Sequence, residues 1–184
     1  MGVVARAARG DSPPKSTTRP SPAAAPPMKG DRFVVVEGPR AGRIIRPQDL
    51  KPGARPILAW PFDVEARVAR NGTVMNELLL LRLRVPDRAH DPMARRLGGI
   101  IAFSAICTHA GCPVTDWLPR RHLLHCLCHG SEYDPAQDAK VVFGPAPRPL
   151  PRLPIAVEHG ALVVAGGFTD RVGGIIGGMQ SRTD

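Results

Sequence analysis

The amino-acid sequence predicts an all-β domain, a small sandwich or barrel of short antiparallel strands. Short apolar runs bounded by glycine, proline or asparagine recur from residue 31 onward. One run, at residues 77–85, alternates between apolar and basic side chains, which is typical of a strand. Helix signals are weak, because only residues 87–96 have a sequence that suits two helical turns. These three observations place the chain in the all-β class.

The predicted strands follow one another along the chain. They cover residues 32–36, 43–46, 56–60, 77–85, 99–106, 122–126, 141–143, 153–157 and 161–165. Asn71 with Gly72 and His159 with Gly160 have the residue types of two-residue hairpin turns. Within 77–85 we expect a half-buried strand. One face of it carries Leu79, Leu81, Leu83 and Val85, and the other carries Arg82 and Arg84.

The composition indicates a globular domain with polar ends. The chain has 184 residues, 43% hydrophobic and 22% charged, with a formal net charge of +9. It has four cysteines and is long enough to bury its own core, which excludes a disulfide-dense mini-scaffold. Residues 1–30 hold five basic residues and one acidic residue among proline, serine and alanine. We therefore expect a disordered basic tail at 1–30, the domain at 31–175 and a C-terminal tail at 176–184.

Neither a nucleic-acid partner nor a transmembrane helix is expected. The basic tail has no run of adjacent basic residues and few aromatic ones, so a solvated linker explains it better than a nucleic-acid-binding arm. The longest stretch without a charged residue, 97–115, includes Ser104, His109 and Pro113, which argue against a membrane span. The N-terminus of the sequence has no apolar segment that would act as an export signal.

All four cysteines lie between residues 107 and 147, in a segment whose glycines and prolines predict loops on a β scaffold. The segments CTHAGC at 107–112 and CLCHGS at 126–131 each contain a cysteine and a histidine at short spacing. Two such loops would offer two thiolates and two imidazoles to a metal. Inert core cysteines are one alternative, and a tetrahedral zinc site is another. Zinc knuckles usually separate cysteines from histidines, whereas each loop here is mixed.

These two segments resemble the two boxes of Rieske iron–sulfur proteins, of the high-potential class with an extra disulfide. The resemblance covers residues 101–147. It implies an antiparallel β base domain with an inserted, smaller cluster-binding subdomain at about 104–147, and one Rieske-type 2Fe-2S cluster. The implied cluster ligands are Cys107, His109, Cys126 and His129. The implied disulfide joins Cys112 to Cys128 and contributes about 3 kcal/mol in the chain-entropy model.

The resemblance also implies residues that tune the cluster. Ser131 matches a serine that donates to a bridging sulfide, and Tyr133 matches a tyrosine that donates to a ligand sulfur. The segment Gly144, Pro145, Ala146 and Pro147 matches the proline loop that covers the cluster. Two departures are visible: Leu127 replaces a common proline, and Ala110 replaces the leucine usual in quinol-oxidising relatives.

The resemblance implies an electron-transfer subunit with no substrate pocket of its own, since such a cluster carries a single electron. Three segments favour the small subunit of an arsenite-oxidase-like complex: GDRF at 30–33, RPQDLKPG at 46–53 and LVVAGGFTDRVGG at 162–174. Ala110 and the lack of an N-terminal helix also favour it. The alternative is the Rieske subunit of a quinol–cytochrome c reductase (cytochrome bc) complex. A ring-hydroxylating oxygenase or its ferredoxin fits less well, because those relatives lack the disulfide cysteines.

Either complex implies a larger catalytic or cytochrome subunit as the partner and a c-type cytochrome or similar protein as the electron acceptor. The expected location is the periplasmic side of a bacterial membrane, because a structural disulfide persists best outside the reducing cytosol.

Overall fold

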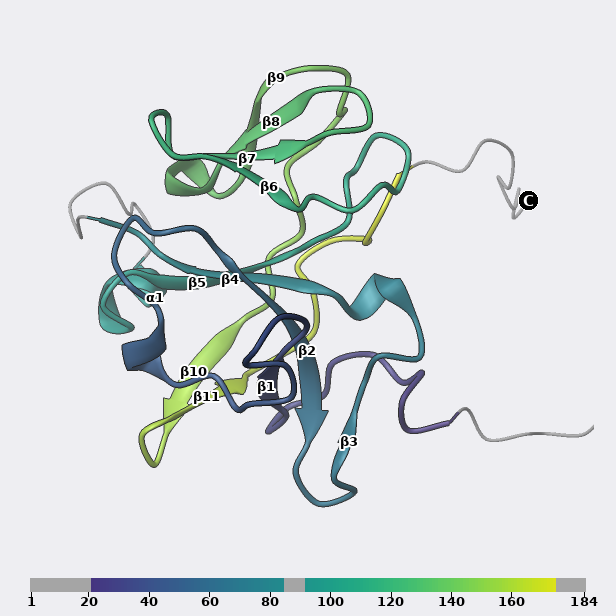
Figure 1. Ribbon diagram of the computed structural model, residues 1–184, viewed down its shortest axis with the longest axis vertical. Coiled ribbons are helices and arrows are strands. Elements are labelled where there is room, and N and C mark those ends of the chain that lie inside the picture. Colours follow the sequence, from purple (N-terminus) through teal and green to yellow (C-terminus); the bar gives the residue numbers. More distant parts are fainter. Residues whose placement is uncertain (1–20, 85–91, 175–184) are drawn as a thin grey trace, which may run out of the picture.

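The computed structural model describes residues 21–84 and 92–174, and in this part of the chain it is built almost entirely from strands (Figure 1). The strands are β1 (Arg32–Val35), β2 (Ile57–Asp63), β3 (Val68–Ala69), β4 (Leu78–Arg82), β5 (Ile100–Ser104), β6 (Asp116–Leu118), β7 (Leu123–Cys126), β8 (Ser131–Asp134), β9 (Lys140–Phe143), β10 (Ile155–Glu158) and β11 (Ala161–Val164). One short helix, α1 (Pro92–Arg96), and three 3-10 turns, Pro47–Asp49, Val74–Asn76 and Pro135–Gln137, complete the described elements. The predicted all-β class is confirmed.

The strands form a base and a smaller inserted unit. In the base, an antiparallel sheet has the order β1-β2-β4-β5 with β3 beside β2, and the β10–β11 hairpin packs against it. Strands β6 to β9 form a separate antiparallel meander in sequence order. This meander lies between β5 and β10 in the sequence and above the base in Figure 1. With the loops on either side of it, the meander corresponds to the inserted unit expected at about 104–147, and we keep for it the name that the resemblance supplied, the cluster-binding subdomain.

Strands β4 and β5 form a wall between two hydrophobic cores. Leu78 and Leu80 face the core shared with the β10–β11 hairpin, whereas Leu79 and Leu81 face the core shared with the cluster-binding subdomain. All four leucines are buried, so the expectation of a half-buried strand at 77–85 is wrong. Residues 78–81 are four consecutive leucines, so both faces of β4 are apolar, and the β10–β11 hairpin covers the face on which the sequence analysis placed Arg82. Residues 85–91 lie outside the described residues.

Several strands differ from the sequence prediction. The strand expected at 43–46 is a single bridge between Ile44 and Val34, because Pro47 starts a 3-10 turn directly afterwards. Strands β3, β6 and β8 were not predicted. They are short, and β8 (Ser131–Asp134) has no apolar alternation, so only pairing with β7 and β9 makes it a strand. The segment 107–147 is therefore not loops alone.

One of the two predicted hairpin turns is correct. His159 and Gly160 have φ values of 49° and 75° and join β10 to β11. The turn between β2 and β3 lies at residues 64–67 instead of at Asn71 and Gly72, and Asp63 accepts a hydrogen bond there from the Ala66 amide. The Gly72 amide donates to the Ala23 carbonyl, so this glycine is a contact point for the N-terminal segment.

Residues 21–30, placed in the predicted tail, are hydrogen-bonded to the base. The buried Arg70 guanidinium pairs with Asp31 and Asp63 and donates to the Pro22 carbonyl, 3.1 Å away. The Asn76 side chain donates to the Ala25 carbonyl at 2.7 Å. The packed part of the chain thus begins before residue 31, whereas residues 1–20 and 175–184 lie outside the described residues. Within the described residues, no helix has the length and apolar character needed to cross a bilayer.

Candidate metal centre

Two loops of the same construction lie side by side, residues 107–112 after β5 and residues 126–131 between β7 and β8. In the first, the Gly111 amide donates to the Cys107 carbonyl at 3.0 Å, and in the second, the Gly130 amide donates to the Cys126 carbonyl at 3.0 Å. Both glycines have positive φ, 77° and 73°, a conformation in which other residues are strained. A glycine four residues after the first cysteine of each box is a sequence signal that our prediction missed.

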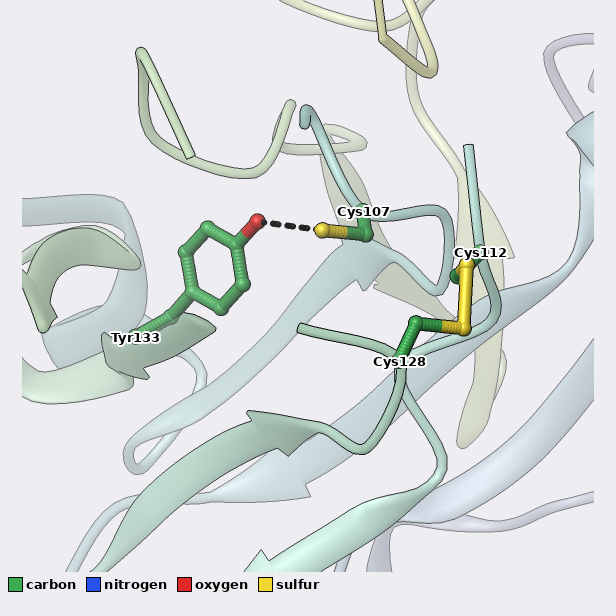
Figure 2. Close-up of a disulfide and its surroundings, with 4 residues drawn as sticks. All are labelled: Cys107, Cys112, Cys128 and Tyr133. Carbon is green, nitrogen blue, oxygen red and sulfur yellow. Dashed lines mark hydrogen bonds between the residues drawn. A yellow bond between two sulfur atoms is a disulfide. The ribbon is translucent and has the colours of Figure 1, made fainter. Parts of the chain in front are cut away.

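A disulfide joins the two loops (Figure 2). It links Cys112 to Cys128 with a Cα–Cα distance of 6.5 Å, which is the pairing that the resemblance implied. The sulfur of Cys126 lies within 4.8 Å of both disulfide sulfurs. Because Cys112 and Cys128 are bonded to each other, they are not free to bind a metal. The bridge instead fixes the distance between the loops that carry the other donors.

The four remaining donors form two adjacent pairs. The thiols of Cys107 and Cys126 are free, interact with each other and are each 1% exposed. The rings of His109 and His129 have centroids 4.7 Å apart and are nearly perpendicular. Each loop supplies one thiol and one imidazole, as the spacing of the two boxes suggested. His109 is half-buried and His129 is exposed, so the imidazole pair lies toward solvent and the thiol pair toward the core.

Two observations show that these donors fit a metal cluster. The Nδ1 atom of His109 is buried, and in the described residues it has no hydrogen-bond partner. Burial raises the pKa of the Cys126 thiol, although backbone amides of Cys128 and His129 act in the opposite direction. A buried pair of thiolates is therefore unfavourable without a nearby positive charge, which an iron or zinc ion would provide. A set of two sulfurs and two imidazoles suits either metal.

Tyr133 extends from β8 to the first loop (Figure 2). Its hydroxyl lies 3.1 Å from the Cys107 sulfur and accepts a hydrogen bond from the Thr108 amide at 3.2 Å. Burial and the neighbouring Cys107 raise the pKa of Tyr133 well above its usual value, so the hydroxyl keeps its proton. A protonated hydroxyl that already accepts from an amide can donate to the sulfur.

The proline loop packs against the second cysteine loop. Gly144 has a φ of 89°, and a Cβ there would lie 2.6 Å from the Cα of Ser131, so only glycine fits. The Ala146 amide donates to the Ser131 hydroxyl oxygen at 3.2 Å, which leaves the hydroxyl hydrogen for another acceptor. Ser131 is fully buried, whereas Pro145 and Pro147 are exposed. The loop thus covers Ser131 from outside.

Sequence reasoning did not identify Thr108 and Arg148 as residues of this site. Thr108 is fully buried between Cys107 and His109, and its hydroxyl donates to the Arg148 carbonyl at 2.6 Å. No motif marks either residue, because the contact joins positions forty residues apart. The two departures from the family pattern, Ala110 and Leu127, are both exposed, so neither fills a core position.

A cleft of about 460 Å³ lies elsewhere, between the edge of the base sheet and the start of β6. Its lining includes Glu37, Arg40, Arg55 and Asp116 over an apolar floor, and none of the predicted site residues. The chemistry of the two loops is therefore separate from this cleft.

Comparison with known proteins identifies a family. Residues 63–154 match the model of the Rieske [2Fe-2S] domain. The cytochrome bc1 complex Rieske iron-sulfur subunit of Streptomyces lividans is 37% identical over 134 residues, which cover 70% of this chain and 78% of that protein. The subunit of the same name from Corynebacterium diphtheriae is 43% identical over 105 residues, 53% of this chain and 26% of that protein. The present chain thus spans about a quarter of the Corynebacterium relative.

A solved structure described as a hyperthermophilic respiratory Complex III also matches. The similarity covers 80% of this chain and 82% of that chain, with 25% sequence identity and a TM-score of 0.48.

Proposed function

The chain belongs to the Rieske [2Fe-2S] family and carries one 2Fe-2S cluster as an electron-transfer protein, and from this premise we propose that it is the Rieske subunit of a cytochrome bc1-type complex. The observation that carries the proposal is the convergence of two buried thiols and two imidazoles from two disulfide-linked loops. We propose that Cys107 and Cys126 hold one iron and that His109 and His129 hold the other.

The choice of donors sets the redox range. When bound, such a cluster takes up and releases one electron, at about −150 to +300 mV compared with about −400 mV for plant-type clusters with four cysteines. Neutral imidazoles in place of two thiolates remove two negative charges from the centre, so an added electron is less strongly repelled. Tyr133 and Ser131 lower this repulsion further, because a buried hydroxyl that donates to sulfur is attracted more strongly as the sulfur gains charge.

The burial of the donors supports an electron route through the imidazole side. Cys107 and Cys126 lie in the hydrophobic core, while His129 is exposed and stands beside Leu127, whose exposed fraction is 68%. A redox partner that covers Leu127 and His129 would come closest to the cluster.

The cytochrome bc complex proposed here is the one that the sequence analysis gave as the alternative. Sequence motifs outside the boxes favoured an arsenite-oxidase-like small subunit, but the relatives found by comparison are named as cytochrome bc1 Rieske subunits. The proposed partners are accordingly a membrane cytochrome subunit and a c-type cytochrome acceptor. The proposed location is the periplasmic side of the membrane, supported by the disulfide between Cys112 and Cys128.

The cofactor assignment is tested on the purified protein by iron and sulfide analysis, low-temperature EPR and a redox titration. We expect two irons and two sulfides per chain, with a potential in the Rieske range. His129→Ala should lose the cluster, whereas His159→Asn, an exposed histidine in the β10–β11 turn, should keep it. Stoichiometric zinc without iron, or an intact cluster in His129→Ala, would refute the ligand assignment.

The complex is tested by isolating this chain with an affinity tag from its native host. We expect b-type haem to copurify and quinol to reduce the Rieske cluster in the isolated complex. A molybdenum-containing partner without b-type haem would favour the arsenite-oxidase-like complex instead. Thiol trapping before lysis should show Cys112 and Cys128 oxidised, and reduced thiols at both positions would contradict the periplasmic location.

A further inference from the structure

The chain that follows β11 leads back to the candidate cluster. Residues 165–174, called here the C-terminal strap, run along residues 148–154. The Ala165 amide donates to the Pro154 carbonyl at 2.8 Å, and the Thr169 amide donates to the Arg152 carbonyl at 2.9 Å. In Figure 1 this yellow segment rises from the base toward the cluster-binding subdomain. The strap thus connects the two parts of the molecule beside the cysteine loops.

Arg148 holds the far end of the strap. Its guanidinium donates to the Gly173 carbonyl at 2.5 Å and to the Asp170 carboxylate at 3.2 Å, and the side chain is only 19% exposed. The carbonyl of the same residue accepts the Thr108 hydroxyl at 2.6 Å. Arg148 therefore links the strap on one side to the first cysteine loop on the other.

Gly174 packs directly against the backbone of His109. A Cβ on Gly174 would overlap the His109 carbonyl oxygen and lie 3.0 Å from the Ala110 nitrogen. Its φ lies outside the left-handed region, so this close approach is what demands glycine there. Gly167, in the same strap, has no atom within 4 Å of an added Cβ.

We infer that Arg148 and the C-terminal strap position His109. The Arg148 carbonyl holds the Thr108 side chain on one side of the loop. On the other side, the close packing of Gly174 restricts the position of the His109 backbone. This inference rests on the proposed role of His109 as a cluster ligand. The orientation of a ligand imidazole is set by the contacts around it, and those contacts tune both ligand and metal. The strap would therefore tune the potential of the cluster without touching it.

The test compares two perturbations with two matched controls in the intact protein. Arg148→Ala releases the strap, and Gly174→Ala pushes the His109 backbone. Arg171→Ala removes the same charge from an exposed neighbouring position, and Gly167→Ala adds the same methyl group in open space. We expect Arg148→Ala and Gly174→Ala to change the EPR g values and to shift the potential beyond either control, and Arg148→Lys to restore part of the change.

Hydrogen exchange gives a second readout that needs no cluster. In Arg148→Ala the Thr108 amide keeps its acceptor, the Tyr133 hydroxyl, so it exchanges faster only because the first cysteine loop opens more often once the guanidinium no longer holds the strap. We expect exchange about tenfold faster, the factor for loss of about one hydrogen bond to a charged group. Arg171→Ala should exchange like the wild type. Wild-type spectra and exchange in both perturbed variants, or an equal shift in Arg171→Ala, would overturn the inference.

The two proposals fail in different ways. If the wild type lacked a Rieske signal, the proposed function would fail, while exchange at Thr108 would still report on the strap. If Gly174→Ala did not fold, Arg148→Ala and Arg148→Lys would decide the matter by themselves.

Discussion

Replacing Tyr133 by phenylalanine removes a single hydroxyl from the candidate centre and leaves the ring in the core. That hydroxyl lies 3.1 Å from the Cys107 sulfur and is fully buried, so bulk water does not weaken the hydrogen bond. Because burial raises the pKa of Tyr133, the group is a donor throughout the physiological pH range. The variant therefore tests how one donated hydrogen bond affects the potential.

The size of the effect follows from the difference between redox states. A hydrogen bond to a charged group contributes about 1.5–3 kcal/mol, and only the part that differs between the oxidised and reduced forms changes the potential. If that part is about 1 kcal/mol, the potential of this one-electron couple falls by roughly 40 mV, since about 59 mV corresponds to a tenfold change. Stability should fall as well, because the Thr108 amide loses its acceptor.

The assay is a redox titration followed by EPR, at one pH and equal iron content. Trp117→Phe is the control: Trp117 lies in the same core, so this variant also loses stability, but it removes no bond to the ligand sulfur. We expect a lower potential in Tyr133→Phe and an unchanged one in Trp117→Phe. Equal potentials in Tyr133→Phe and the wild type would refute the reasoning, whatever the loss of stability.

Three further predictions concern the same loops and the base. Ser131→Ala should leave the cluster assembled with a potential lower by about the same amount, and an unchanged potential in a titration would show that Ser131 only anchors the Ala146 amide. Cys112→Ser combined with Cys128→Ser should cost about 3 kcal/mol in the chain-entropy model and give a cluster that is lost faster on warming; an equal rate of bleaching would contradict the role of the disulfide. Burial and the nearby Glu37 raise the pKa of Glu77 above 4.5, so the folded state holds its proton longer than the unfolded state and stability falls as pH rises from that value toward the folded pKa. Glu77→Gln should abolish this fall in stability and raise the melting temperature at pH 7, and Glu37→Gln should reduce the fall without abolishing it. Parallel pH profiles of stability in the wild type and Glu77→Gln would contradict the prediction.

Local chemistry in the sequence determined the identity of the site. Cys107 and His109 lie two residues apart, and Cys126 and His129 three, so the sequence alone shows that each loop can offer one thiol and one imidazole to the proposed cluster. The turn at His159 and Gly160 could also be predicted, because its positive φ values depend on those two residues. Fold class followed similarly from the spacing of apolar runs between turn residues.

Only the tertiary structure decided which faces are buried and which distant residues support the loops. The leucine run of β4 did not indicate which elements cover its two faces; the cluster-binding subdomain covers one face and the β10–β11 hairpin covers the other. Strand β8 exists because β7 and β9 pair with it, and Arg148 meets Thr108 and Gly173 only because the chain folds back. The physical reason is that the spacing of a cysteine and a histidine is a property of one loop, whereas the meeting of the two loops, their burial and their support come from contacts between segments that lie far apart in the sequence.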